Sequence, residues 1–146
     1  MIINDTWIMG EKTNMFNNDQ LIGILLSIAK PEIHVSRAAN TNIGYRVRIR
    51  VNIRGNKDFL LGVQRALDKK TIETTFKEKE HKSRPRPILS IGGIVNLYKL
   101  CDLMPSNLPD AKGNWGTLKQ VVEIVDNGEH HTLEGLDKIL QIKGEI

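Results

Sequence analysis

The chain has 146 residues, which is enough for one domain with a hydrophobic core of its own. Its 21 Lys and Arg outnumber its 17 Asp and Glu, so the formal net charge is +4 and an acidic partner is favoured. A single cysteine excludes an internal disulfide framework, and the four histidines lack zinc-like spacing. No apolar run approaches the roughly 20 residues of a membrane span, and the polar N-terminus lacks a signal-peptide core. We therefore expect an intracellular protein without a membrane partner.

Residues 1–17 show no sustained periodicity, so we predict an N-terminal extension followed by one domain over residues 18–146. The domain opens with N-cap chemistry at residues 17–19 and an apolar helix over residues 21–29. Pro31 ends this helix because proline disfavours the helical conformation of the residue before it.

This first helix is apolar on nearly all sides, so it must be covered on more than one side. Gly23 and Ser27, four residues apart, form a strip of small residues that another backbone could approach closely. Two alternatives stay open at the level of sequence: a helix–helix interface, and a central core helix inside a monomer.

The strongest pattern in the chain is a ten-residue strand predicted over Tyr45–Arg54, which follows a shorter strand over residues 33–37. Its residues alternate strictly, so one face is expected to be aliphatic and buried. The opposite face is expected to project Arg46, Arg48, Arg50, Asn52 and Arg54 outward.

This exposed row spans roughly 26 Å at ~3.3 Å per residue. A phosphate backbone would neutralise its mutually repelling cations and release counterions, which favours nucleic acid as the partner. Arginine also donates two parallel hydrogen bonds to a phosphate or a guanine edge. The alternative is a solvated face that is salt-bridged to a neighbouring strand through Glu73 and Glu78.

The remaining segments complete an α+β order. We predict a helix over residues 57–67, a strand over 71–77, a charged loop or hairpin over 78–87, a strand over 88–91, and helices over 94–104, 115–125 and 133–142. Thr132 is expected to cap the last helix. This order is typical of an antiparallel sheet covered by helices on one face.

The order and three of its segments resemble a LAGLIDADG homing-endonuclease domain. The similar segments are the helix at 21–29, the strand-turn-helix at 45–61, and the closing helical pair with its Glu129-His130, Thr132 and Glu134-Gly135-Leu136 elements. The resemblance covers about residues 18–143. It implies an αββαββα(α) fold whose antiparallel sheet is saddle-shaped and lies on nucleic acid.

The resemblance also implies a use for two surfaces. Domains of this family pair through the signature helix, and chains with one signature form homodimers. This implies a second copy or another protein as the partner of Leu21, Gly23, Ile24, Ser27 and Ile28. The sheet and its loops are implied to contact nucleic acid through Arg37, Arg46, Arg48, Arg50, Asn52, Arg54, Lys79, Lys82, Arg84 and Arg86.

Enzymes of this family hold a divalent cation with an acidic residue near the end of each signature helix. Here that position falls at Ile28, and isoleucine cannot ligate Mg²⁺. Glu32 is the nearest carboxylate and the fallback candidate. The supporting Gln and Lys of the family fall at Asn56 and near Lys112. We therefore predict no catalytic residues, no metal and no cofactor, with Mg²⁺ needed only if the chain is an active endonuclease.

The sequence thus predicts a non-catalytic nucleic-acid-binding protein on a homing-endonuclease scaffold. Its basic loops favour structured RNA over DNA, as in an intron-encoded maturase-like protein or a ribonucleoprotein component. One alternative is a metal-dependent endonuclease that cuts double-stranded DNA. Another is a protein-interaction module that docks through the apolar helix. A composition rich in Ile and Asn favours an AT-rich genome and therefore an organelle such as the mitochondrion.

Overall fold

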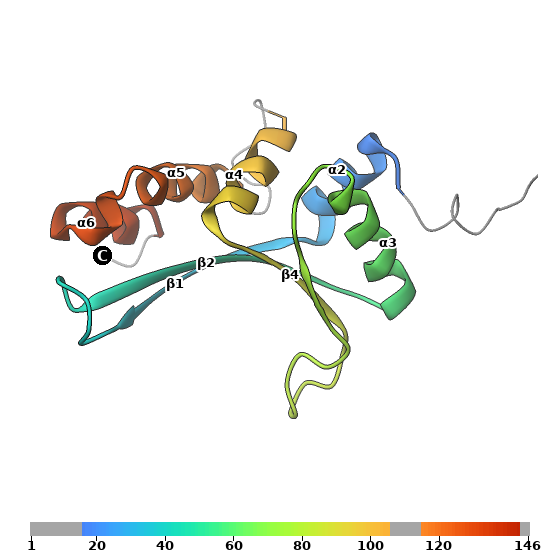
Figure 1. Cartoon of the computed structure of the whole chain (residues 1–146), viewed down its shortest axis with the longest axis horizontal. Helices are drawn as coiled ribbons and strands as arrows, with labels where there is room; N and C mark the ends of the chain where they lie inside the picture. The colour runs from blue at the N-terminus through green and yellow to red at the C-terminus, as the bar shows by residue number, and fades with distance from the viewer. Residues whose placement is uncertain (1–15, 106–114, 144–146) are drawn as a thin grey trace, which may run out of the picture. The chain divides into compact units, whose positions relative to one another are not determined.

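The computed structural model describes residues 16–105 and 115–143, and the predicted α+β order is confirmed in them (Figure 1). The described elements are α2 (Asn18–Ile28), β1 (Lys30–Arg37), β2 (Tyr45–Arg54), α3 (Lys57–Asp68), β3 (Thr75–Lys77), β4 (Ile88–Gly92), α4 (Ile94–Leu103), α5 (Trp115–Asp126), a 3₁₀ turn (Glu129–His131) and α6 (Leu133–Lys143). Three helices therefore follow the last described strand. The predicted N-terminal extension lies almost entirely outside the described residues.

The four strands form an open antiparallel sheet in the order β1-β2-β4-β3. The chain divides into two compact units that share β2. Of the described residues, the α2–α3 unit contains 16–29 and Asn52–Ile91, and the α4–α6 unit contains Lys30–Val51, 92–105 and 115–143. None of the described helices is long and apolar enough to cross a membrane.

Helix α2 of the α2–α3 unit begins at the predicted capping residues and ends before Pro31, as predicted. The Asn17 side chain accepts a hydrogen bond from the Gln20 N–H at 2.8 Å, and the Gln20 side chain accepts one from the Asn17 N–H at 2.9 Å. This capping box satisfies two N–H groups that lack helical partners. Ala29 is already extended (φ −71°, ψ 135°), and Pro31 disfavours a return to the helical conformation at Lys30.

Helix α3 and strand β4 supply most of the core of this unit. Asn56 caps α3 by accepting a hydrogen bond from the Phe59 N–H at 2.9 Å. The α3 side chains Leu60, Val63 and Leu67 are fully buried, as are Leu89 and Ile91 on β4. Helix α2 packs against α3, and its Leu21 and Leu25 side chains are buried.

Strand β3 is shorter than predicted, because it begins at Thr75 rather than at Thr71. Thr71 has a φ of +59°, and its N–H bonds the Asp68 carbonyl at 2.9 Å. Residues near Thr71 therefore belong to the turn that ends α3. The register of the short strand pairs Thr75 with Ser90 and Lys77 with Ile88.

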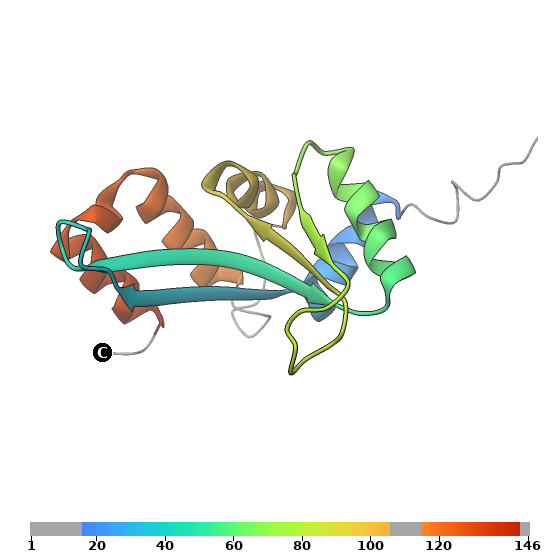
Figure 2. The same cartoon turned by 60° about the horizontal axis from the view of Figure 1, so that its bottom comes forward.

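In the α4–α6 unit, strands β1 and β2 lie under the three C-terminal helices (Figures 1 and 2). Strand β1 begins three residues before its predicted start and includes Pro31, which is tolerated because β1 is an edge strand. The Lys143 ammonium at the end of α6 donates to the Ile33 carbonyl at 2.6 Å. This contact ties the last described helix to β1.

The closing helices follow the prediction closely, apart from the additional 3₁₀ turn. Gly128 adopts φ +74°, which favours glycine, and opens this turn. Thr132 caps α6 as predicted, since its hydroxyl accepts the Gly135 N–H at 3.0 Å. Gly135 lies so close to the turn that a Cβ atom there would overlap the Glu129 carbonyl. Glycine is therefore required by packing at this position.

Candidate nucleic-acid interface

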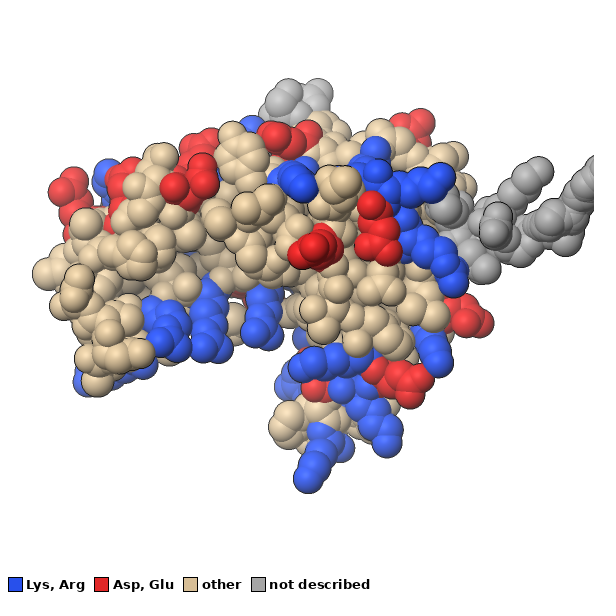
Figure 3. All heavy atoms as spheres, in the orientation of Figure 1, with Lys and Arg blue, Asp and Glu red and all other residues tan. Residues whose placement is uncertain are grey.

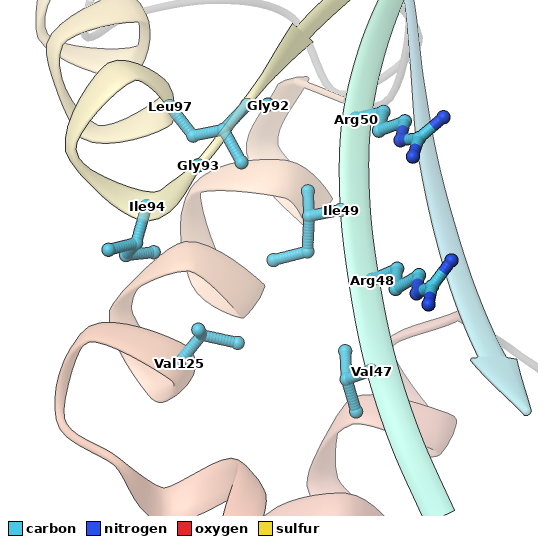
Figure 4. A pocket seen from close by; sticks show the side chains of 9 residues that line it. All are labelled: Val47, Arg48, Ile49, Arg50, Gly92, Gly93, Ile94, Leu97 and Val125. Atoms are coloured by element: carbon cyan, nitrogen blue, oxygen red, sulfur yellow. The ribbon is translucent and has the colours of Figure 1, made fainter. Parts of the chain in front are cut away.

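Two arginines project from the outer face of β2 in the α4–α6 unit. Figure 4 shows Arg48 and Arg50 pointing away from the side on which Val47 and Ile49 face the helices. The alternation of the strand produces this division, because successive side chains point to opposite faces. Arg48 and Arg50 are exposed, whereas Ile49 is buried. The predicted basic face of β2 is therefore present over this part of the strand.

These two arginines are available to an external partner. Within residues 16–105 and 115–143, neither Arg48 nor Arg50 forms a hydrogen bond or an ion pair. Arg46 precedes them on the same face and donates to the Asn40 side chain at 3.3 Å, which directs it along the β1–β2 turn. In Figure 3 blue side chains line the side of the molecule below the β1–β2 ribbon of Figure 1. This ribbon face is therefore strongly cationic.

Strand β1 contributes a different chemistry to the ribbon. Glu32 and His34 share one face of β1 by alternation, and their side chains approach to 3.3 Å. Arg37 is exposed, yet it alternates with Ile33 and Val35, whose face is turned toward the core. The alternation therefore does not place Arg37 on the same face as Glu32.

The outward row predicted for β2 is interrupted at Asn52. The Asn52 side chain is only 7% exposed and accepts a hydrogen bond from the Ser90 hydroxyl at 2.7 Å. Its predicted exposure is therefore wrong, because β4 brings Ser90 from 38 residues away to cover it. This hydrogen bond provides the buried Asn52 oxygen with a donor inside the protein.

Arg54 is also engaged within the protein. Its guanidinium donates two hydrogen bonds to the Glu80 carboxylate, at 2.7 and 2.8 Å. Glu78, one of the two glutamates that the sequence suggests as partners of the basic row, instead pairs with Lys57 at 2.7 Å. The prediction that Arg54 projects outward without a partner is therefore wrong, because Glu80 holds its guanidinium.

A second basic surface lies on the α2–α3 unit, in residues 78–87 between β3 and β4, which we call the basic hairpin. The Glu80 N–H bonds the Arg86 carbonyl at 2.8 Å, and His81 and Arg84 exchange backbone hydrogen bonds at the tip. Figures 1 and 3 show the hairpin projecting with blue side chains. The predicted cations of this segment are all exposed: Lys79, Lys82, Arg84 and Arg86.

Helix α2 presents a partly open apolar surface. Leu21 is buried within the unit, so its predicted place at an interface is wrong. Ile28 is 39% exposed, and the small residues of the predicted strip are exposed as well. A shallow hollow of about 470 Å³ lies over this side, lined by Phe16, Gln20, Gly23, Ile24, Ser27, Ile28 and Phe59. The helix is therefore covered by α3 on one side and accessible on another.

The end of α2 offers no carboxylate. The helix ends at Ile28, and Glu32 is the third residue of β1, where it contacts His34. Asn56 serves as the N-cap of α3. The described part of the chain contains no group of three His, Cys, Asp or Glu that could hold a metal ion. Lys112 lies outside the described residues.

A second hollow, which sequence patterns did not indicate, lies in the α4–α6 unit between β2 and the start of α4 (Figure 4). Its volume is about 340 Å³. The side chains that point into it are aliphatic, including Val47, Ile94 and Val125. Because Arg48 and Arg50 point away from it, the hollow contains no side chain suited to acid–base chemistry.

Comparison with known proteins defines the class of this fold. No protein-family model and no curated protein matches the sequence. Solved structures of LAGLIDADG homing endonucleases do match, so the chain has the LAGLIDADG homing-endonuclease fold. Sequence identity to these structures is below 25%, so the likeness concerns the fold alone.

Three of these structures show the extent of the match. The homing endonuclease I-TnaI is 24% identical with a TM-score of 0.74, and the match covers 90% of this chain and 88% of I-TnaI. I-LtrWI, bound to its target DNA, is 23% identical with a TM-score of 0.74, over 89% of this chain and 45% of I-LtrWI. The archaeal intron-encoded I-Vdi141I, in complex with DNA, is 15% identical with a TM-score of 0.74, over 88% and 80%. The chain thus spans most of I-TnaI and less than half of I-LtrWI.

Proposed function

We propose that this chain binds double-stranded DNA through the β1–β2 ribbon and does not cleave it. The observation that carries the proposal is the pair Arg48 and Arg50. They are exposed, they have no partner among the described residues, and they lie on a ribbon whose other face is packed by helices. Such cations bind phosphates with counterion release and can also read guanine edges.

Duplex DNA fits this ribbon better than RNA. The major groove of B-DNA, about 12 Å wide, admits a two-stranded β-ribbon, whereas the major groove of A-form RNA is deep and too narrow for side chains to read. The sequence-based preference for RNA rested on the basic loops alone. The DNA-bound states of I-LtrWI and I-Vdi141I, which share the fold, support the same choice.

The absence of cleavage follows from the chemistry at the end of α2. A divalent cation beside a scissile phosphate needs carboxylate oxygens, and Ile28 supplies none. Glu32 contacts His34 within β1 and belongs to a strand rather than to the end of the helix. A purified protein that makes double-strand breaks in bound DNA with Mg²⁺ would refute this part of the proposal.

A salt titration of binding tests the ribbon assignment. The double variant Arg48→Ala/Arg50→Ala should bind duplex DNA at least tenfold more weakly than the unmodified protein, because one charge-assisted hydrogen bond contributes about 1.5–3 kcal/mol. The slope of log K against log salt should become shallower by about 2, one for each lost phosphate contact. Arg65→Ala with Lys69→Ala is the matched control, because it removes the same charge from exposed positions at the end of α3.

Equal losses in the two double variants would refute the ribbon assignment, because net charge alone would then explain binding. A structured RNA of the same length should bind more weakly than the duplex. Tighter binding of the RNA would overturn the choice of DNA and would support RNA as the partner, as the basic loops suggest.

We also propose that the hollow on α2 binds a second copy of the chain. The hollow combines exposed small residues with aromatic and aliphatic side chains. Because the match covers only 45% of I-LtrWI, that protein is long enough to hold two domains of this size, and a second copy of this chain would supply the other one here. Gly23→Leu should shift the protein toward monomer in light scattering. If the unmodified protein itself had the mass of a monomer, the pairing would be refuted.

A further inference from the structure

An ion pair between Arg54 and Glu80 joins the basic hairpin to β2. Arg54 and Glu80 are 26 residues apart, and the Arg54 Nε and terminal nitrogen donate to separate Glu80 oxygens at 2.7 and 2.8 Å. Both side chains are largely covered, with 25% and 17% of their surface exposed. A two-point contact of this kind restricts both the distance and the orientation of its partners.

The pair acts at the base of the hairpin. The Glu80 N–H donates to the Arg86 carbonyl at 2.8 Å. Glu80 therefore both accepts the hydrogen bonds of Arg54 and links the two arms of the hairpin. Nearer the tip, His81 pairs with Arg84 across the exposed residues Lys82 and Ser83. Fixing Glu80 therefore fixes the direction in which the cations of both arms leave the sheet.

Charge alone makes Glu80 unfavourable on this surface. Hydrogen bonding from Arg54, with the nearby charges of Arg84 and Arg86, lowers the pKa of the Glu80 carboxyl to about 2. Glu80 is therefore a full negative charge at neutral pH, amid cations that are exposed to a polyanion. A negative charge in that place weakens phosphate binding unless it also orders the cations around it.

We infer that Arg54 and Glu80 are positioning residues that hold the basic hairpin in place to contact the phosphate backbone of DNA. The inference rests on the proposed function and deepens it by assigning a second contact surface. Arg54 then supports the hairpin from within the protein and does not itself bind DNA. The contacts to phosphate are made by the exposed cations on either side of Glu80.

The neighbouring pair Lys57–Glu78 provides a matched control. It has a single contact of 2.7 Å, and its side chains are 54% and 66% exposed. Glu78 is two residues from Glu80, so Glu78→Gln and Glu80→Gln change the net charge equally and at nearly the same place. The two substitutions differ in whether they loosen the two-point attachment of the hairpin.

The experiment compares the affinity of both variants for one DNA duplex over a salt series. Glu78→Gln should bind as tightly as the unmodified protein or up to a few-fold more tightly. Glu80→Gln should bind about tenfold more weakly, with a salt slope shallower by at least 1, because loosened cations make fewer phosphate contacts. Equal tightening in both variants would overturn the inference.

Hydrogen exchange separates the inference from the proposed function. The Glu80 and Arg84 amides, which bond across the hairpin, should exchange faster in Glu80→Gln than in Glu78→Gln, whether or not DNA is bound. Unchanged exchange would overturn the positioning role. Absence of any salt-dependent DNA binding by the unmodified protein would instead refute the proposed function.

A second variant tests the two-point geometry with a smaller change to the fold. Arg54→Lys keeps the positive charge but replaces the planar fork with a single ammonium. It should reduce affinity and salt slope in the same direction as Glu80→Gln, with little change in thermal unfolding. Full affinity in Arg54→Lys would show that the two-point geometry is not needed and would overturn the inference.

Discussion

Gly135→Ala should destabilise the protein, although alanine is normally the better helix residue. Gly135 lies in the first turn of α6, where replacement by alanine would stabilise an isolated helix by about 1 kcal/mol. In this fold the new Cβ would overlap the Glu129 carbonyl, and backbone atoms cannot move aside as a flexible side chain can. The 3₁₀ turn or the start of α6 must therefore shift.

The steric penalty should exceed the gain in helix propensity. Overpacking against neighbouring atoms costs about 1–3 kcal/mol, and displacing the turn also threatens the Thr132 cap, which is worth about 1 kcal/mol. After subtracting the gain from alanine, we expect a net loss of about 1–3 kcal/mol. At about 3 °C for each kcal/mol, the midpoint of thermal unfolding should fall by roughly 3–9 °C.

The measurement is thermal and urea unfolding followed by circular dichroism. Gly23→Ala is the control, because it makes the same substitution in α2, where a Cβ would meet no atom within 4 Å outside the local backbone of its own helix. Measured at concentrations where the chain is monomeric, Gly23→Ala should raise stability by about 1 kcal/mol. If Gly135→Ala proved as stable as Gly23→Ala, the close approach of α6 to the 3₁₀ turn would be refuted.

Three further predictions concern single groups. Ser90→Ala should cost about 1–2 kcal/mol in urea unfolding, because the Asn52 oxygen loses its donor, and an unchanged midpoint would contradict that contact. Burial raises the pKa of the Cys101 thiol to about 11, so a thiol reagent at pH 8 should react only in denaturant. The lowered pKa of Glu80 means that its contribution is present above pH 4.5 and lost toward pH 2, so Glu80→Gln should flatten acid unfolding between these values.

Local patterns predicted the elements that depend on neighbours in the chain. The α2 boundaries follow from a capping residue and a proline, and the β2 boundaries follow from ten residues of strict alternation. The family resemblance, drawn from the same segments, pointed to the fold that the solved structures of homing endonucleases share. Short-range signals were sufficient there because each is complete within a few residues.

The candidate interface was predicted only in part. Alternation indicates which side chains share a face, but it does not show what another segment brings against them. Arg48 and Arg50 remain exposed, whereas β4 covers Asn52 and the hairpin supplies Glu80 to Arg54. These partners are 38 and 26 residues away, so no local spacing could have identified them.

The sequence by itself determined the order of helices and strands, the basic outer face of β2 and the aliphatic residue Ile28 at the end of α2, because these depend on residue type and short-range spacing. The tertiary structure decided which of the basic residues are available to a partner. Long-range contacts bury Asn52, engage Arg54 and leave Arg48 and Arg50 exposed. The same row of alternating residues therefore divides into internal contacts and an open cationic surface.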